Sequence, residues 1–271
     1  MIIDTHCHAG LNWFEPIESL IFQMDMNEID SCVLIQHAGY FDNSYILDAV
    51  KKYPKKFRAM GLLNFQEDIK LLLKKIDELF INKGSGIRLN LNYPNKIHDN
   101  VINICKAVSN KGLKISVSGD LNNFSSKGFE NLIYECNDTI FIIEHLAGIG
   151  KLIDSQVNFD LKDKSMSPFK NILNLSKYKN VYIKIPGLGE LTSRPNLLNN
   201  HYPFIKDRFD IIRTTMDFFT SKRMMWGSDF PPVSNREGYR NSLKGILKLE
   251  NISEDEKNDV FSVVPKKLFF S

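Results

Sequence analysis

The sequence lacks the features typical of membrane, secreted and nucleic-acid-binding proteins. No apolar run is long enough to span a bilayer, and no basic segment precedes an apolar stretch at the N-terminus. The net charge is only +3 and the lysines are interspersed with acidic residues, so a nucleic-acid partner has little support. The four cysteines are far apart in the sequence, which favours reduced thiols in a cytoplasmic protein over a disulfide framework.

Phosphate-binding glycine motifs are absent too. No G-x-G-x-x-G or P-loop pattern follows any apolar run, which argues against a nucleotide-binding doubly wound sheet. The chain also has no internal repeat and no low-complexity linker. Its 271 residues, 43% hydrophobic and 25% charged, have the balance of a globular protein and fit one large α/β barrel or two ordinary domains.

Short β-branched runs alternate with stretches of helical periodicity along the whole chain. The predicted strands cover residues 2–5, 31–36, 57–63, 86–90, 113–117, 140–145, 181–185 and 223–226. The predicted helices between them cover residues 65–80, 101–110, 128–136, 205–219 and 240–249. Eight alternating strands predict a single (β/α)8 barrel over residues 1–271, with a C-terminal helical segment at 254–270. The long irregular segments 149–168 and 186–203 follow strands and should build the active-site face.

Two histidines, His6 and His8, end the first apolar run. Residues two apart on a strand point to the same side, so both imidazoles should enter one space, with Cys7 facing the opposite way into the core. Paired imidazoles are a poor apolar core but a good start to a metal site. The last strand is followed by an acid, Asp229, within the segment MWGSDFPP. A closed barrel, whose first and last strands are neighbours, would bring these groups together.

Other polar residues lie at or just beyond the predicted strand ends. They are Gln36, His37, Arg88, Asn90, Glu144, His145 and Lys184. Polar groups gathered at this rim of a barrel are what a catalytic site requires. By strand alternation Glu144 should point away from the barrel lumen and act as a structural ion-pair partner.

The HxH after strand one, the histidine in IIEHLAG and the acid in MWGSDFPP together resemble the amidohydrolase superfamily. More narrowly, the chain resembles the amidohydrolase-related branch of sugar-acid lactonases, 2-pyrone-4,6-dicarboxylate lactonases and aminocarboxymuconate-semialdehyde-type decarboxylases. The segments GIRLNL and NVYIKIPGL support this resemblance. It implies a metal-dependent-hydrolase barrel with His6, His8, His145 and Asp229 as ligands of one divalent metal, Zn²⁺ or Mn²⁺.

The chain departs from the binuclear members of that superfamily. Strand four offers Arg88 and Asn90 where a bridging ligand would stand, and strand five has no histidine. A two-metal site is therefore not expected. Either one metal is bound, with His145 as ligand or catalytic base, or the site works without metal. In both schemes Asp229 takes a proton from the attacking water and the reaction is hydrolysis of an activated carbonyl.

Cationic groups near the rim suggest an acidic or polyhydroxylated lactone as substrate. The candidates for binding it are His37, Arg88, Lys184, His201 and Arg236. Each has a structural alternative: Arg88 could pair with Asp4 or Glu144, Lys184 could be a buried ion-pair partner, and Arg236 could be a solvated loop arginine.

Three other functions remain open at this point. Within enzymes, the rivals are a metal-dependent decarboxylase of a small carboxylic acid and, less favoured, an amidohydrolase acting on a C–N bond. The missing strand-five histidine argues against the decarboxylase. Outside enzymes, a degenerate barrel that only binds a ligand is the alternative. We expect a small-molecule substrate as partner, and a homo-oligomer is compatible with the sequence.

Overall fold

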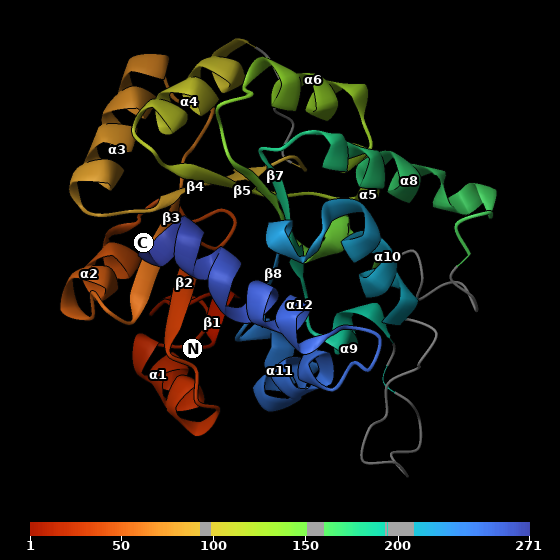
Figure 1. The fold of residues 1–271 in the computed structure, drawn as a ribbon. Coiled ribbons are helices and arrows are strands. Elements are labelled where there is room, and N and C mark those ends of the chain that lie inside the picture. The colour runs from red at the N-terminus through yellow and green to blue at the C-terminus, as the bar shows by residue number, and fades with distance from the viewer. Residues whose placement is uncertain (93–98, 151–159, 193, 195–208) are drawn as a thin grey trace.

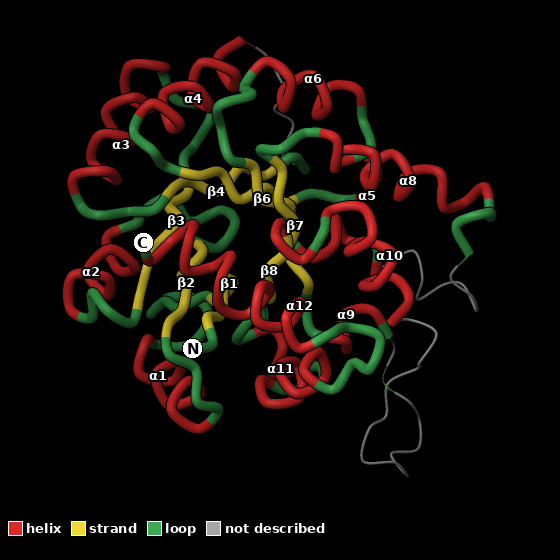
Figure 2. The backbone as a smooth tube through the Cα atoms, in the orientation of Figure 1, coloured by secondary structure: helices red, strands yellow, loops and turns green. Residues whose placement is uncertain are grey.

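The computed structural model describes residues 1–92, 99–150, 160–192, 194 and 209–271. Its centre is an eight-stranded parallel sheet in which each strand pairs with the next one along the chain (Figures 1 and 2). The strands are β1 Ile3–Cys7, β2 Ser31–Ile35, β3 Phe57–Leu62, β4 Gly86–Asn90, β5 Lys114–Ser118, β6 Phe141–Ile143, β7 Val181–Ile185 and β8 Met224–Trp226. All eight overlap the predicted strands, and the (β/α)8 barrel is confirmed.

The barrel closes between its first and last strands, as the sequence predicts. The Thr5 hydroxyl donates to the Trp226 carbonyl at 2.6 Å, and Cys7 forms an isolated parallel bridge with Phe230 just beyond β8. Because of this closure, the segment after β8 runs alongside the end of β1.

Helices surround the sheet (Figure 2). Their bounds are α1 Ile17–Met26, α2 Ser44–Lys52, α3 Ile69–Ile81, α4 Asp99–Asn110, α5 Leu121–Phe124, α6 Lys127–Glu135, α8 Ser167–Asn174, α9 Leu188–Leu191, α10 Phe209–Phe219, α11 Tyr239–Leu247 and α12 Glu254–Asn258. In α3 the 3–4 spacing buries Leu72, Ile76 and Leu79 against the sheet, and the Asp68 side chain caps the first turn. Of the segments predicted as irregular, 149–168 ends in the first residues of α8 and 186–203 contains α9. Residues 205–208 of the predicted helix 205–219 lie outside the described part.

The C-terminal segment packs against the barrel interior near the end where the strands begin. After α12 the chain continues in wider helical turns over Asp259–Val263 and Lys266–Phe270. Leu268 and Phe269 join a buried cluster with strand residues from β2, β3, β6, β7 and β8. The guanidinium of Arg58, near the start of β3, lies 4.5 Å from the ring centre of Phe270. This segment therefore covers the end of the barrel where the strands begin, and leaves the other end for the site.

Among the described helices, none is both long and apolar enough to cross a membrane.

Candidate active site

The first strand delivers two imidazoles to one space, as predicted. His6 ends up fully buried, His8 is 4% exposed, and their ring centres lie 5.0 Å apart in an edge-to-face arrangement. The His8 Nδ1 hydrogen is donated to the Ile35 carbonyl at 2.7 Å, because a carbonyl can only accept. In the neutral His8 ring this leaves the Nε2 lone pair directed into the site. Cys7 points to the outer core and is buried there, also as predicted.

Asp229 is held against the histidines by backbone contacts. Its N–H donates to the His6 carbonyl at 2.8 Å, and the next residue, Phe230, accepts from the His8 N–H at 2.7 Å. Two residues earlier, Gly227 lies so close to His6 that a Cβ there would meet the His6 Cβ at 2.5 Å. Only glycine allows this approach. As a result Asp229 Oδ1 lies 3.3 Å from His8 Nε2 and 3.8 Å from His6 Nε2.

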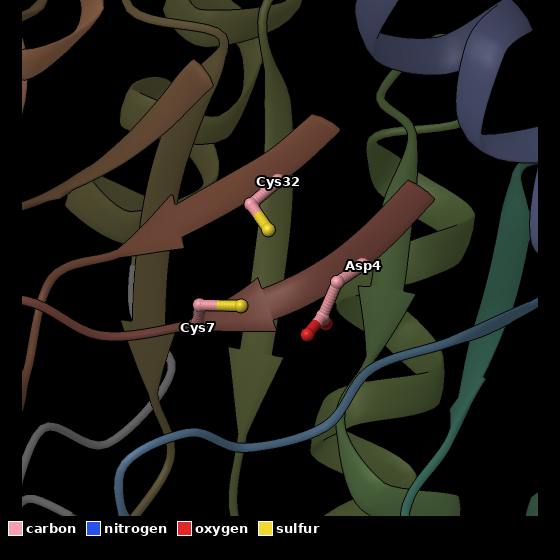
Figure 3. Close-up of side chains that lie close together, drawn as sticks. All are labelled: Asp4, Cys7 and Cys32. Carbon is pink, nitrogen blue, oxygen red and sulfur yellow. The ribbon is translucent and has the colours of Figure 1, made fainter. Parts of the chain in front are cut away.

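Asp4 fixes the segment that carries Asp229. Its Oδ1 accepts from the backbone N–H groups of Ser228 and His6, at 2.9 and 3.1 Å, and its Oδ2 accepts from the Tyr239 hydroxyl at 2.8 Å. Figure 3 shows Asp4 and Cys7 on β1 beside Cys32 on β2. This trio has the residue types of a metal site. However, both oxygens of the Asp4 carboxylate already accept hydrogen bonds, and burial raises the pKa of both thiols, so we assign the trio a structural role.

His145 reaches the same centre through a left-handed turn after β6. Residues His145, Leu146 and Ala147 have φ values of 52°, 48° and 61°. The His145 ring centre lies 4.5 Å from that of His6, and its Nδ1 lies 3.1 Å from Glu190 Oε2. Burial lowers the pKa of His145, but the carboxylates of Glu190 and Asp229 outweigh burial and raise it to about 9. In this arrangement His145 is a cation rather than a base.

The prediction that Glu144 points away from the lumen is wrong. Ile142 faces the barrel interior, and the alternation continues through the extended Glu144, so Glu144 faces inward. The left-handed turn that starts at His145 then brings His145 to the same face. The prediction that Glu144 is an ion-pair partner is confirmed, because its carboxylate accepts hydrogen bonds from both Nε and Nη2 of Arg88, at 3.1 and 2.7 Å. Ser116 also donates to it, at 2.7 Å.

Two predicted substrate-binding cations therefore lie below the rim rather than in the open mouth. Arg88 uses its third group, Nη1, on the Gln36 carbonyl at 3.2 Å. Lys184 is 2% exposed, and its Nζ lies 3.2 Å from His6 Nδ1 and 3.3 Å from Ser116 Oγ. Burial lowers the pKa of Lys184, and the charge of Glu144 opposes that effect, which leaves it at about 8. The structural alternative for Arg88, pairing with Glu144, is the contact observed.

Arg236 and His37 lie closer to the open mouth. Arg236 Nη1 lies 3.3 Å from Asp229 Oδ2 and 3.5 Å from Glu190 Oε2, while its Nη2 is buried without a hydrogen-bond partner. His37 stacks on Tyr40 and faces a pocket of about 270 Å³ formed by the segments after β1 and β2. Its Nδ1 is likewise without a partner. The predicted site residue His201 lies outside the described residues.

The electrostatics keep Asp229 ionised. Burial alone would raise its pKa, but the charge of His145, with that of Arg236, outweighs burial and holds the pKa at about 2. The carboxylate is therefore a permanent acceptor at neutral pH, surrounded by cations that suit a second, substrate-borne anion.

The donor set fits a divalent metal. A ligand atom from each of His6, His145 and Asp229 lies within 4.8 Å of the others, and His6 Nε2 is buried without a partner. The His8 Nε2 lone pair faces an Asp229 oxygen at 3.3 Å, and two acceptors so close need a proton or a cation between them. Two ligands of one tetrahedral Zn²⁺, each about 2 Å from the ion, are separated by roughly this distance.

Several residues of the site were not found from the sequence. Asp4, Ser116 and Glu190 make essential contacts, but each looks like an ordinary strand or loop residue in isolation. For the strand that ends at Ser118, the sequence indicated only that it has no histidine. The Ser118 hydroxyl is buried without a hydrogen-bond partner. Strand alternation from Ser116 would have predicted that Ser118 also faces the lumen.

Comparisons with known proteins identify the family of the chain and support its fold. A family model for amidohydrolases matches residues 3–270. No curated protein matches the sequence closely enough to be counted. Among solved structures, a probable 2-pyrone-4,6-dicarboxylic acid hydrolase from Acinetobacter baumannii, with citric acid bound, is 17% identical with a TM-score of 0.75, covering 100% of this chain and 99% of that one.

Two further solved structures are similar. An amidohydrolase from Burkholderia multivorans with bound Zn is 13% identical, with a TM-score of 0.78 and coverage of 100% and 99%. The 5-carboxyvanillate decarboxylase from Sphingomonas paucimobilis is 12% identical, with a TM-score of 0.65 and coverage of 99% and 98%. At these identities the likeness concerns the fold. The family model spans nearly the whole chain, so the protein belongs to the amidohydrolase family and is an enzyme of that type.

Proposed function

We propose that this enzyme hydrolyses a small acidic lactone, with Asp229 as the residue that activates water. The observation that carries the proposal is the position of the Asp229 carboxylate, ionised and 3.3 Å from His8 Nε2, beside the His145 cation. A base and a positively charged hydrogen-bond donor at one point are what ester hydrolysis needs.

The steps follow from the charges. Asp229 takes a proton from water as the water oxygen bonds to the lactone carbonyl carbon. The His145 cation stabilises the negative charge that develops on the carbonyl oxygen. The ring C–O bond then breaks, and Asp229 returns its proton to the departing ring oxygen. The product is an open-chain hydroxy acid, and the carboxylate is ready for another cycle.

A divalent ion, when bound, would be held by His6, His8, His145 and Asp229, which requires a neutral His145 and an Nε2 lone pair on His6. It would supply a Lewis acid for the carbonyl and lower the pKa of water; Zn²⁺ or Mn²⁺ suits this nitrogen and oxygen donor set. Asp229 would handle the proton in either case, whereas histidines that hold the ion would leave the stabilisation of the carbonyl oxygen to it.

Arg236 is the substrate-binding cation that we favour. Its Nη2 is buried without a partner, whereas the Arg88 donors are taken by Glu144 and Gln36. The stacked rings of His37 and Tyr40 lie in the segment after β2, where they would contact the ring of the substrate. One structurally similar protein is described as a probable 2-pyrone-4,6-dicarboxylic acid hydrolase, which supports screening dicarboxylic lactones first.

A metal-dependent decarboxylase is the second candidate, because one structurally similar protein is described as a decarboxylase. The end of β5 offers Ser118 in place of a histidine, which favours hydrolysis. The deciding experiment incubates the purified enzyme, with and without added Zn²⁺ or Mn²⁺, with sugar-acid lactones, pyrone dicarboxylate and aromatic carboxylic acids. Acid release without CO₂ supports hydrolysis. CO₂ release, or turnover of amides alone, would refute it.

A further inference from the structure

Lys184 is a buried charge to which hydrolysis assigns no task. It lies on β7, its ammonium contacts His6 in the barrel interior, and it is 2% exposed. A lysine ammonium has three hydrogens and no lone pair, so in each of its hydrogen bonds it must be the donor. Its two side-chain contacts are His6 Nδ1 at 3.2 Å and Ser116 Oγ at 3.3 Å.

The contact with Lys184 determines where His6 carries its hydrogen. Nδ1 must accept from the ammonium, so a neutral His6 ring has its hydrogen on Nε2. The competing acceptor near Nδ1, Glu144 Oε1, is 4.0 Å away, beyond hydrogen-bond distance. Nε2 faces the reaction centre, with Asp229 Oδ1 3.8 Å away. We propose that Lys184 is a positioning residue that holds His6 in the Nε2–H form.

A network from β4, β5, β7 and the residue after β6 keeps Lys184 in place. Ser116 accepts a hydrogen bond from the Lys184 ammonium and donates its own hydroxyl hydrogen to the Glu144 carboxylate. The Arg88 guanidinium also donates to this carboxylate. All four side chains lie in the barrel interior, and three of them are almost fully buried. The donor and the acceptor of each hydrogen bond in this network are fixed, because Arg88 can only donate and the Glu144 carboxylate accepts.

This arrangement differs from that of His8. His8 donates its Nδ1 hydrogen to a backbone carbonyl, which leaves Nε2 free to bind a cation; this is the usual arrangement for a histidine that ligates a metal. His6 presents an N–H at the corresponding atom. His6 is therefore equipped to donate a hydrogen bond to Asp229 or to the carbonyl oxygen of the substrate. Ligation of a metal through His6 would require that hydrogen to be displaced.

The inference rests on the proposed function only for the role given to His6. Its test needs no substrate, so failure of the test and failure of lactone hydrolysis are distinguishable. The measurement is a long-range ¹H–¹⁵N correlation spectrum of histidine-labelled protein, which reports which ring nitrogen carries the hydrogen. A His6→Asn variant assigns the signal. Lys184→Met removes the donor, Lys184→Arg retains one, and Lys114→Met is the matched control on a strand lysine at the start of β5.

The wild type and Lys114→Met should show His6 with its hydrogen on Nε2. Lys184→Met should populate the Nδ1–H form and bind Zn²⁺ about 10–100-fold more tightly, the size of effect typical of groups that contact metal ligands. Lys184→Arg should stay close to the wild type. An Nδ1–H signal in the wild type would overturn the proposal, and this result needs no variant to fold. An unchanged tautomer or unchanged zinc affinity in folded Lys184→Met would overturn it as well.

Discussion

At the scale of single residues, the site consists of ions whose partners decide their tasks. Arg88 and Arg236 have the same side chain, but Arg88 is held by Glu144 and Gln36, whereas Arg236 keeps a buried nitrogen without a partner. Likewise His8 presents a lone pair and His145 a positive charge. Residue type alone predicted a cationic, histidine-rich centre; the contacts assign the roles.

Arg236→Met should weaken binding of an anionic lactone. We expect KM to rise about tenfold or more, since a charged hydrogen bond contributes about 1.5–3 kcal/mol, while a neutral lactone should be affected less. Steady-state kinetics on a matched acidic and neutral pair measures this. Arg240→Met, at an exposed position of α11, is the control. Equal KM changes for both substrates would remove Arg236 from substrate binding.

The pH dependence should identify the His145 cation. The Glu190 and Asp229 charges raise the pKa of His145 to about 9, so the cation is present below that pH and lost above it. Accordingly kcat/KM should fall as the pH rises through about 9. Glu190→Gln removes one of these charges and should move this alkaline limb to lower pH, whereas Glu135→Gln, exposed at the end of α6, should not. An alkaline limb that stays in place in Glu190→Gln would contradict the assignment.

At the scale of elements, the connections after the strands determine the site more than the strands do. Periodicity predicted all eight strands, because buried β-branched runs between helical patterns are a strong local signal. The prediction for Glu144 was wrong because it assumed that His145 follows the strand alternation; the left-handed turn from His145 to Ala147 brings His145 to the face on which Glu144 already lies. Three consecutive non-glycine residues in this conformation are rare, and nothing in their side chains announces it.

The ion pair between Glu144 and Arg88 can be tested by substitution of Glu144. Glu144→Gln leaves the Arg88 guanidinium buried without its counter-charge, and breaking such a pair costs about 3–5 kcal/mol of unfolding free energy. The charges of Arg88 and Lys184 outweigh burial and hold the pKa of Glu144 at about 2. The stabilisation by Glu144 is therefore complete above its ordinary pKa of 4.5 and is lost as the pH falls toward 2.

Denaturant unfolding at pH 7 and at pH 3 measures this difference. The difference in unfolding free energy between the wild type and Glu144→Gln should be larger at pH 7 than at pH 3. Glu250→Gln, at an exposed position, should have no effect at either pH. A difference that is the same at both values would mean that the ion pair is not its source.

At the scale of the whole molecule, stability and chemistry lie at opposite ends of the barrel. The C-terminal segment fills the end where the strands begin, and the histidines and Asp229 lie where they finish. The helical character of that segment was predictable from the sequence. Its position in the barrel was not, because long-range packing leaves no local pattern.

Phe269→Ala should therefore destabilise the fold without altering the chemistry. Removing this ring, which is 5% exposed, should cost about 3–5 kcal/mol of unfolding free energy and leave KM unchanged at a temperature where the variant is folded. Phe218→Ala, at a site that is 42% exposed, is the matched control and should cost much less. A change in KM would show that the two ends of the barrel are coupled.

The most direct test of the account is kcat of Asp229→Asn on the lactone that the wild type hydrolyses fastest. Asparagine keeps the shape and removes the base, so kcat should fall about 10²–10⁴-fold with little change in KM. Asp217→Asn, on an exposed acid of α10, should match the wild type. An Asp229→Asn enzyme within a few-fold of wild-type kcat would contradict the assignment of Asp229 as the water-activating residue.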